Sequence, residues 1–514
     1  MHLRHTLALA VAAAVAATAP AQNLELDVQG GSLPGLVSLD AWPGATFFEP
    51  IMIVPSTNAG PTPCQLFDVN DFRSLDVGLE LLSLAWAGLS GLDGHYRVQF
   101  AVPASPSLQD VPLHFQAVTF QFAFTVLDRI SNPNAIRLGV AGSFRDRAVY
   151  SQFDRAFATV IQRPDRKPML VGGARGLLLA QQAWATTEVY NIATDTFAAG
   201  PTMTTPRSLH TCTRLPNGQW LLTGGVQQTN DPQASCELYD PATDSFVATA
   251  PMGTPRTGHT ATLLPNGKVL VTGGIQAMPV TPTQLQPIRE IVNSTEIYDP
   301  ATGAWTAGPN MSTPRAGHSA IVRPNGQVAL VGGISWDANL LFGWLPAVRR
   351  SIDLYNPTTN TIAVGPQMAT ARSLIDPVDL GGDRWLFAGG INGITIIPFN
   401  PGNPTAAAEI YNAAANTWTA VGAMATARGN HRGWALGNGR FLLAGGANGS
   451  ILSPTPLAST EVFDPATNLF TPGPAMSVPR AGAAETTTHQ GQIQVFGGGS
   501  TGGTITASTE WWYF

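Results

Sequence analysis

The sequence is poor in charged residues and has no excess of basic ones. Only 12% of its 514 residues are Asp, Glu, Lys or Arg, and the formal net charge is −6. A nucleic-acid partner would require a basic face that displaces counterions from phosphates, so we expect no nucleic acid to bind. The hydrophobic fraction of 44% is ample for a packed core and excludes a disordered chain.

Cysteine is also scarce, since the sequence has only Cys64, Cys212 and Cys236. This number is too small for a framework of disulfides and is odd, so at most one intramolecular bridge can form. Stability must therefore come from packing. The sequence leaves open whether Cys212 and Cys236 pair.

Long hydrophobic runs are missing as well. No stretch of the mature chain approaches the roughly 18 consecutive apolar residues of a membrane-spanning helix, so we expect no membrane span. The amino terminus has a positive charge at Arg4 and an apolar run from Leu7 to Ala17 that is too short to cross a bilayer. The small residues Ala19-Pro20-Ala21 then form a cleavage site. We therefore expect residues 1–21 to be a signal peptide and the mature protein to be secreted, into the extracellular space or the periplasm.

No helical period of 3.6 residues holds over a useful length in the segment that follows. Stretches rich in β-forming residues alternate there with Pro, Gly, Asn and Asp. These features predict an all-β sandwich domain over residues 22–142. The predicted strands are Leu36–Trp42, Phe47–Val54, Leu75–Trp86, Tyr96–Val102, Leu113–Phe122 and Ala135–Val140.

From residue 143 onward the sequence is periodic. A Gly-Gly doublet ends a short apolar run seven times, and an arginine stands seventeen residues before each doublet. The first glycines of the doublets are Gly172, Gly224, Gly273, Gly332, Gly389, Gly445 and Gly497. The arginines are Arg155, Arg207, Arg256, Arg315, Arg372, Arg428 and Arg480. Glycine at the end of a strand permits another backbone to approach closely.

Each of the last six arginines is preceded, nineteen residues earlier, by an acid. The acids are Glu188, Glu237, Glu296, Asp353, Glu409 and Glu461. An aromatic residue follows two positions after each acid, and a methionine fifteen positions after it. A period near 50 residues accommodates four short strands and their turns, so the pattern predicts repeated four-stranded units. The aromatic residues and methionines are expected to fill the space between these units.

The repeats resemble kelch repeats. The similarity lies in the apolar run that ends in Gly-Gly, in the segment from Glu296 to Trp305 and in the segment Met…Pro-Arg-x-x-His. It extends over roughly residues 143–514. The resemblance implies a β-propeller of four-stranded blades around a central channel, like the central domain of galactose-oxidase-like proteins.

The register of the repeats indicates how such a propeller closes. The last repeat has its acid at Glu510 and stops at Phe514, without a fourth strand. A spare strand at Ser143–Tyr150 precedes the first complete blade. We expect this strand to complete the last blade, which removes an open sheet edge. The prediction is an all-β protein with a seven-bladed kelch-type propeller over residues 143–514, preceded by the small β-sandwich.

The recurring charged residues and histidines have a structural interpretation. An acid and an arginine in every repeat do not suit a single substrate, so we expect buried structural pairs. Histidine follows the arginine by three positions at His210, His259, His318 and His431. Equivalent positions on different blades point to different places, so these histidines are predicted to be structural or to line the channel. We assign no catalytic residue and no metal ligand.

The resemblance to galactose oxidase raises the hypothesis of a copper-radical oxidase. That family binds copper with tyrosines and histidines and links one tyrosine to a cysteine. Here five of the eight tyrosines occupy the scaffold position after the acid, and the family's carboxy-terminal domain has no counterpart. We therefore expect no cofactor. A glycan hydrolase stays open, because paired carboxylates on separate blades leave no local signature.

The longest variable segments lie between the Gly-Gly doublet and the acid in the third, fourth and fifth blades. Long loops on a rigid scaffold are where binding usually resides. The fourth blade's loop contains Trp336, Asp337, Phe342, Trp344, Arg349 and Arg350. This composition resembles a hot spot for contact with a glycan or a protein. The alternative is that these aromatic residues cover the channel or dock on the amino-terminal domain.

These features predict a secreted, non-catalytic and monomeric protein that binds a glycan or a protein ligand. The alternative is an extracellular carbohydrate-active enzyme, either a galactose-oxidase-like oxidase or a glycan hydrolase. The feature that separates the two is whether acids or metal ligands that break the repeat converge on the channel face.

Overall fold

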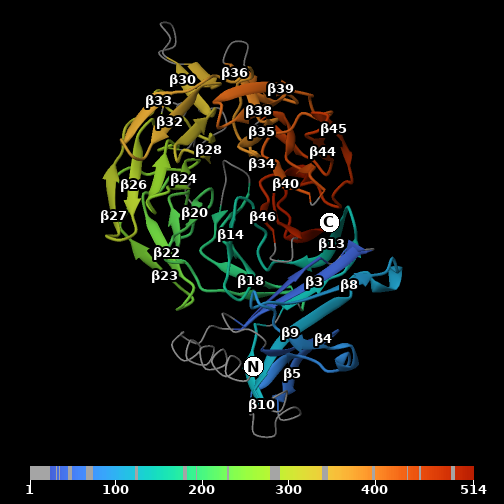
Figure 1. Ribbon diagram of the computed structural model, residues 1–514. Coiled ribbons are helices and arrows are strands. Elements are labelled where there is room, and N and C mark those ends of the chain that lie inside the picture. The colour runs from blue at the N-terminus through green and yellow to red at the C-terminus, as the bar shows by residue number, and fades with distance from the viewer. Residues whose placement is uncertain are drawn as a thin grey trace, which may run out of the picture.

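The computed structural model describes most of the chain between residues 24 and 513 (Figure 1). The segments outside the description are 1–23, 31, 34, 44–48, 65–72, 122–125, 133, 177–181, 193, 228–230, 278–289, 338–344, 396–399, 437, 451–452, 488–491 and 514. The predicted signal peptide, residues 1–21, therefore lies outside the described residues. The described part is all-β, as predicted, and none of its helices is long and apolar enough to cross a membrane.

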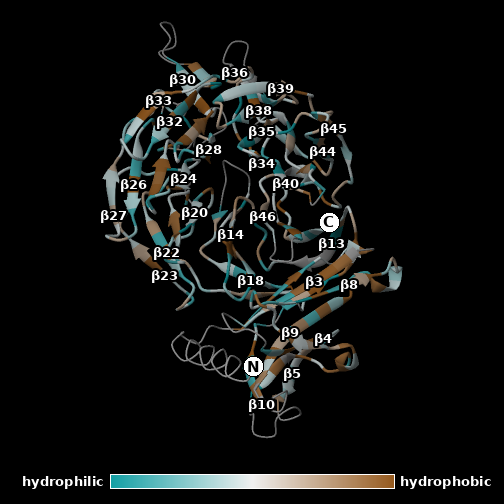
Figure 2. Ribbon diagram, in the orientation of Figure 1, coloured by the Kyte–Doolittle hydropathy of each residue, from teal (hydrophilic) through white to brown (hydrophobic). Residues whose placement is uncertain are grey.

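The amino-terminal part consists of two packed β-sheets, which confirms the predicted sandwich. One sheet has the strand order β1-β3-β8, and the other has the order β10-β9-β4-β7 with β11 paired to β9. Their bounds are β1 (Glu25–Gln29), β3 (Gly35–Trp42), β4 (Pro50–Ser56), β7 (Trp86–Leu89), β8 (Tyr96–Val102), β9 (Pro112–Gln121), β10 (Val126–Ile130) and β11 (Asn134–Arg137). Leu26 and Val37 of one sheet pack with Ile53 and Phe115 of the other in a common core. Figure 2 shows hydrophobic residues alternating with hydrophilic ones along the strands.

Two predicted strands of the sandwich are wrong. Ala135–Val140 is divided into β11, which pairs with β9, and β12 (Gly139–Val140), which pairs with β2 (Ser32–Leu33). The segment Leu75–Trp86 is divided, because β6 (Ser74–Val77) is followed by a turn and the 3-10 helix η2 (Leu82–Leu84) before β7 begins. In this turn the Glu80 carboxylate accepts a hydrogen bond from the Asn58 N–H at 2.8 Å, which directs the chain away from the sheet. The remaining short elements are β5 (Ala59–Pro63) and η3 (Pro106–Leu108).

Seven four-stranded antiparallel sheets form a ring (Figure 1), which confirms the predicted seven-bladed propeller. The innermost strands of neighbouring blades, for example β14 and β20, lie side by side around the central channel. Blades one to three are β14 (Thr159–Gln162), β15 (Pro168–Val171), β18 (Thr187–Asn191), β19 (Thr196–Ala199); β20 (Thr211–Arg214), β21 (Trp220–Thr223), β22 (Cys236–Asp240), β23 (Ser245–Thr249); and β24 (Thr260–Leu263), β25 (Val269–Thr272), β26 (Thr295–Asp299), β27 (Ala304–Ala307). Blades four to six are β28 (Ser319–Val322), β29 (Val328–Val331), β32 (Ile352–Asn356), β33 (Thr361–Val364); β34 (Val378–Gly381), β35 (Arg384–Ala388), β38 (Ala408–Asn412), β39 (Thr417–Val421); and β40 (Arg432–Ala435), β41 (Phe441–Ala444), β44 (Thr460–Asp464), β45 (Leu469–Gly473). Blade seven is β46 (Ala484–Thr487), β47 (Ile493–Phe496), β48 (Ser508–Tyr513) and β13 (Ser143–Tyr150).

The ring closes along the predicted route. Strand β13 pairs antiparallel with β48, with Ser143 opposite Tyr513. Strand β13 is thus the outermost strand of blade seven, whose innermost strand β46 lies beside β14 of blade one. Phe144 also packs edge-on against Trp512, with the ring centroids 4.9 Å apart. Two segments from far apart in the sequence therefore join within one sheet and close the ring.

The repeated arginine is the centre of a hydrogen-bond network in every blade. All seven arginines are almost completely buried, and Nη1 of each donates to the carbonyl of the first glycine of its blade's doublet at 2.6–2.9 Å. Each guanidinium also pairs, at 2.7–3.2 Å, with the acid that follows it in its own blade. The pairs are Arg155–Glu188, Arg207–Glu237, Arg256–Glu296, Arg315–Asp353, Arg372–Glu409, Arg428–Glu461 and Arg480–Glu510. The expected buried structural pairs are confirmed.

The second glycine of each doublet joins neighbouring blades. Its N–H donates to the backbone carbonyl of the next blade's arginine, for example from Gly225 to Arg256 at 2.8 Å. The bond from Gly498 to Arg155, at 2.9 Å, runs from blade seven to blade one and completes the circle. A Cβ on Gly224 would stand 2.4 Å from the Arg256 carbonyl oxygen, and its φ is +58°. The doublet is therefore required by a close approach of two backbones.

The aromatic residues and methionines at fixed positions fill the space between blades, as expected. At the junction of the first and second blades, Met203, Tyr239 and Phe246 pack with Met169 and Leu222 in one buried cluster. The next two junctions repeat this arrangement. Close packing of this kind, rather than cross-linking, holds the blades together.

Arg256→Ala should destabilise the propeller. The substitution leaves the Glu296 carboxylate buried without its cation, which costs about 3–5 kcal/mol. Thermal unfolding followed by circular dichroism should therefore show a clearly lower Tm. Arg384→Ala, at an exposed position of blade five, is the control and should unfold like the wild type. Equal Tm values for both variants would contradict the structural role of the arginine.

Two truncated chains test the contribution of β13. A chain that starts at residue 136 keeps β13 and should form a folded propeller. A chain that starts at residue 151 lacks β13, leaves the edge of β48 unpaired and should be rapidly digested or aggregate. Limited proteolysis and circular dichroism of the two chains measure the difference. A stable, cooperatively unfolding chain from residue 151 would show that closure by β13 is dispensable.

Candidate functional site

The repeat is broken on the inner strands of the last three blades. The fourth residue after the repeated arginine stands at the beginning of the innermost strand, and it is Thr or Ser in the first four blades. In the last three blades this position holds Asp376, Arg432 and Ala484, and Glu485 follows directly. Acids that depart from the repeat therefore meet on the channel side. We refer to Asp376, Arg432 and Glu485 as the channel cluster.

In three of the four repeated histidines Nε2 is bound by hydroxyl groups, while Nδ1 has no hydrogen-bond partner among the described residues, and this burial fits the structural role predicted for them. His210, His259 and His318 are buried. Nε2 of His259, for example, lies 3.2 Å from Thr211 Oγ1 and 3.0 Å from Thr223 Oγ1 in the preceding blade. Burial, assisted by nearby positive charge, lowers the pKa of each of these histidines to about 3. They are therefore neutral scaffold residues at physiological pH.

His431 differs from its counterparts. Only 1% of it is exposed, and neither ring nitrogen has a hydrogen-bond partner among the described residues. The two hydroxyls that bind His259 are replaced, in the blade before His431, by Asp376 and Ala388. Burial lowers the pKa of His431 to about 3, so the ring is neutral. His431 thus has two buried ring nitrogens without a partner, whereas in each of its three counterparts only Nδ1 lacks one.

Arg432 stands between two carboxyl groups from the neighbouring blades. Its Nη1 lies 4.0 Å from Asp376 Oδ2, and its Nε lies 3.9 Å from Glu485 Oε1. These distances are too long for direct hydrogen bonds, and the guanidinium donates instead to the Ala483 carbonyl at 3.3 Å. The three charged side chains are 23–33% exposed. All three side chains are therefore partly accessible to solvent.

The surroundings change the protonation of the two carboxyl groups. Burial raises the pKa of Glu485 to about 8, while Arg432 opposes this shift and Asp376 adds to it. Burial also raises the pKa of Asp376, against the effect of Arg432. At neutral pH Glu485 therefore holds a proton most of the time and can donate as well as accept a hydrogen bond.

Three hairpins form a row on the propeller. They are β30 (Ile334–Asp337) with β31 (Leu345–Val348), β36 (Ile391–Thr395) with β37 (Asn400–Pro404), and β42 (Ala447–Ser450) with β43 (Ser453–Pro456). Strand β31 lies beside β36, and β37 lies beside β42 (Figure 1). Each hairpin begins with a bridge to the residue after the repeated arginine, as Ile334 does with Ala316. The row therefore stands on the face where the innermost strands begin, which is also the face of the channel cluster.

Two smaller elements complete the propeller, the hairpin of β16 (Ala174–Arg175) with β17 (Gln182–Ala183) and the 3-10 helix η5 (Thr501–Gly503).

Of the predicted ligand-binding residues, Trp336 and Asp337 lie on β30 of the first of these hairpins, and Arg349 and Arg350 directly follow β31. Phe342 and Trp344 lie outside the described residues. Nη2 of Arg349 donates to Asp337 Oδ1 at 2.6 Å and to the Trp336 carbonyl at 2.9 Å, which holds the hairpin together. Trp336 is half-buried and Arg350 is exposed, and their contact with a ligand stays a prediction.

The sequence analysis missed the channel cluster. Its three residues are far apart in the sequence and match no motif. The signal in the sequence is a departure from the repeat. Asp376 and Arg432 replace the Thr or Ser that the first four blades have at this position, and Glu485 directly follows Ala484, which replaces it in the last blade. Comparison of every register position across the seven repeats would have found it.

The described residues do not form a copper site of the galactose-oxidase type. In this part of the chain no group of three His, Cys, Asp or Glu side chains is placed to hold a metal ion. The tyrosines at the repeat position are buried between blades. Cys212 and Cys236 are not joined in a disulfide, and burial raises their pKa to about 12 and about 11. Neither thiol is therefore activated.

The seven four-stranded blades make the second part of the chain a β-propeller, and a kelch motif lies within it. The family model of the kelch motif matches residues 255–312, which contain the whole of blade three. No curated protein sequence matches the chain.

Many solved structures match the chain, and the following are two of them. One is described as a novel fungal alcohol oxidase with catalytic diversity among the AA5 family, in complex with copper. It is 17% identical with a TM-score of 0.53, over 72% of this chain and 76% of that chain. The other is described as YjhT, which is 15% identical with a TM-score of 0.44, over 60% of this chain and 95% of that chain. At such low identity the likeness to the alcohol oxidase concerns the fold alone.

Glu485→Gln should change the pH dependence of stability. The pKa of Glu485 is about 8 in the folded protein and ordinarily 4.5, so the unfolded chain releases this proton more easily. The stabilising contribution is complete below pH 4.5 and is lost as the pH rises through 8. The Tm of Glu485→Gln should therefore fall less than the wild-type Tm over this range. Glu290→Gln, at an exposed position, should follow the wild type. Parallel Tm curves for Glu485→Gln and the wild type would contradict the raised pKa.

Proposed function

We propose that this protein is a secreted carbohydrate-binding protein whose ligand enters the channel from the face with the row of hairpins. The observation that supports this most is the channel cluster. A regular repeat has no structural reason to replace hydroxyls by charged groups in adjacent blades, and such departures from a rule are expected at functional sites. Secretion is supported by the signal-peptide pattern of residues 1–21.

The chemistry of the channel cluster suits a polyhydroxylated ligand better than a simple ion. Asp376 repels an anion, and Arg432 repels a cation. A hydroxyl group both donates and accepts, so one hydroxyl can bind the guanidinium while another binds a carboxyl group. The spacings of 3.9 and 4.0 Å leave donors and acceptors of the cluster available, because they are too long for direct hydrogen bonds.

The row of hairpins extends this site beyond the channel. It stands on blades four to six, next to the part of the mouth where the channel cluster lies. Trp336 offers a half-buried aromatic surface in this row, and its indole Nε1 has no hydrogen-bond partner among the described residues. Aromatic rings with a polar group suit the apolar face and the hydroxyls of a sugar. The hairpin residues predicted from the sequence would then contact the outer part of a longer glycan.

A glycan hydrolase is the second candidate, and a specific observation favours it. Glu485 and Asp376 are two carboxyl groups near one arginine, and Glu485 holds a proton at neutral pH. A protonated carboxylic acid next to a second carboxyl group is the pair that glycoside hydrolases use.

A glycan array probed with the mature protein, residues 22–514, identifies the ligand, and titration calorimetry then measures its affinity. Arg432→Gln should weaken binding roughly 10- to 100-fold, as expected when hydrogen bonds to a charged group are lost. The Tm should stay close to that of the wild type, because Arg432 is partly exposed. Arg384→Gln, at an exposed position of blade five, is the matched control and should bind normally.

Three outcomes separate the possibilities. Wild-type affinity in both Arg432→Gln and Glu485→Gln would place the ligand elsewhere. Binding to proteins but to no glycan would reject the carbohydrate. Release of reducing sugar that Glu485→Gln abolishes would favour the hydrolase.

A further inference from the structure

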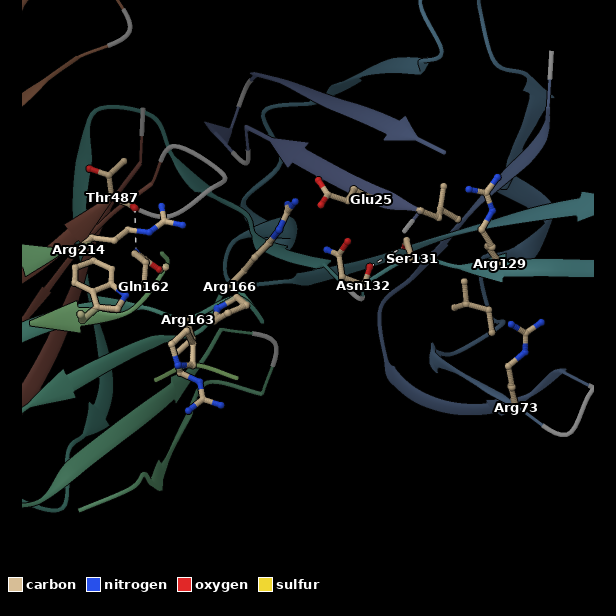
Figure 3. A pocket seen from close by; sticks show the side chains of 16 residues that line it. Glu25, Arg73, Arg129, Ser131, Asn132, Gln162, Arg163, Arg166, Arg214 and Thr487 are labelled. Carbon is tan, nitrogen blue, oxygen red and sulfur yellow. Dashed lines mark hydrogen bonds between the residues drawn. The ribbon is translucent and has the colours of Figure 1, made fainter. Parts of the chain in front are cut away.

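A large polar cleft lies between the sandwich and the propeller, away from the channel cluster. It has a volume of about 1030 Å³ and is lined by side chains from both parts (Figure 3). On the propeller it reaches the turn after β14 and the turn after β20. These turns stand at the ends of the innermost strands, whereas the hairpin row stands at their beginnings. This sandwich–propeller cleft therefore belongs to the opposite face of the propeller.

Arginine dominates the charge of the sandwich–propeller cleft. Two arginines come from the sandwich and three from the propeller, and Figure 3 shows them on both sides of the opening. They are Arg73, Arg129, Arg163, Arg166 and Arg214. Glu25 is the only carboxylate among the described residues that line the cleft. The lining is therefore richer in positive than in negative side chains, while carboxylates outside it pair with Arg129, Arg163 and Arg166.

Carboxylates behind the cleft hold some of these arginines in place. Arg166 pairs with Asp27 at 2.9 Å, across the junction of the two parts, and Arg163 pairs with Asp244 at 2.6 Å. Neither carboxylate lines the cleft. A guanidinium has five N–H donors, so a single ion pair leaves donors that can bind an anion. Arg163 also pairs with Asp165 at 3.2 Å, and Arg129 pairs with Glu49, so these two are more fully bound. Arg166, with one ion pair, keeps donors that can bind an anion.

Arg214 is available to a ligand. It stands at the end of β20 and is exposed, and its side chain makes no hydrogen bond or ion pair with any described residue. Near it, Gln162 donates from Nε2 to the Thr487 carbonyl at 3.2 Å, and its Oε1 is buried without a partner. The half-buried indole of Trp220 lines the same side of the cleft. An aromatic surface beside arginines suits a sugar ring that bears an acidic group.

We propose that the sandwich–propeller cleft binds an acidic oligosaccharide, whose carboxylate or sulfate groups pair with Arg214 and Arg166 while a sugar ring rests on Trp220. The volume of about 1030 Å³ reaches the upper end of the range of roughly 300–1,000 Å³ that small-ligand sites occupy, and it accommodates several sugar rings. The net negative charge of the whole chain disfavours binding of longer polyanions such as nucleic acids, because they extend beyond the cleft. This site is separate from the carbohydrate site proposed at the channel mouth.

The test uses the mature protein and three hexasaccharides, namely a sulfated heparin fragment, an oligogalacturonate and neutral maltohexaose. Titration calorimetry should detect binding of at least one acidic probe that Arg214→Glu weakens, whereas any binding of maltohexaose should be the same in Arg214→Glu and the wild type. Raising NaCl from about 0.05 M to about 0.5 M should lower the affinity for the acidic probe more than tenfold, because salt screens the charges of the arginines. Arg214→Glu should lower the affinity for the acidic probe at least tenfold, and the milder Arg214→Gln should lower it less. Both variants should unfold at the wild-type Tm.

Two control variants make the result specific. Arg384→Glu changes the charge of an exposed arginine outside the cleft and should bind the acidic probe normally. Arg432→Gln removes the cation of the channel cluster and should also leave this binding unchanged, which separates the two sites. The proposal is overturned if neither acidic probe binds, if Arg214→Glu binds like the wild type, or if Arg384→Glu or Arg432→Gln causes an equal loss.

Discussion

The stability of the ring depends on one buried guanidinium in each blade. Its Nη1 and Nη2 or Nε atoms bind the carbonyl of a glycine and the acid of the same blade, while its backbone carbonyl accepts a bond from the blade before. The planar fork of arginine matches this geometry, whereas lysine offers only a point charge. Seven copies of this contact align the blades, so the ring needs neither disulfides nor a metal. The strict spacing of arginine and glycine in the sequence follows from this requirement.

The fold was predictable because this contact repeats. Counting from Arg155 identified β13 as a spare strand and placed it beside Glu510. The sandwich has no such repeat, and there the β-forming residues from Leu75 to Trp86 predict a single strand that the structure does not contain. The Glu80 carboxylate, which accepts from the Asn58 N–H, makes a turn that propensity does not reveal. Local preference was overridden by a contact between residues that are distant in the sequence.

The candidate site was harder to predict, for a related reason. Regular spacing draws attention to residues that recur, whereas Asp376, Arg432 and Glu485 are exceptions to the recurrence. They meet only because the inner strands of blades five to seven stand side by side, which no local pattern shows. The spacing in the sequence also does not show which acid pairs with which arginine. Glu237 binds Arg207, which precedes it, because β22 lies next to β21 and places Glu237 opposite Leu222.

The position of β13 has a mechanical consequence. Only Ala141 and Gly142 separate β12 from β13, so the sandwich is attached to the closing strand without a flexible tether. Closing the ring therefore also fixes the direction in which the sandwich stands. A force that pulls the sandwich away from the propeller acts directly on the seam between β13 and β48, and the seam lies along the outer edge of blade seven. Under tension the ring would open at this seam first, strand by strand from the outside, while the six continuous blades remain intact.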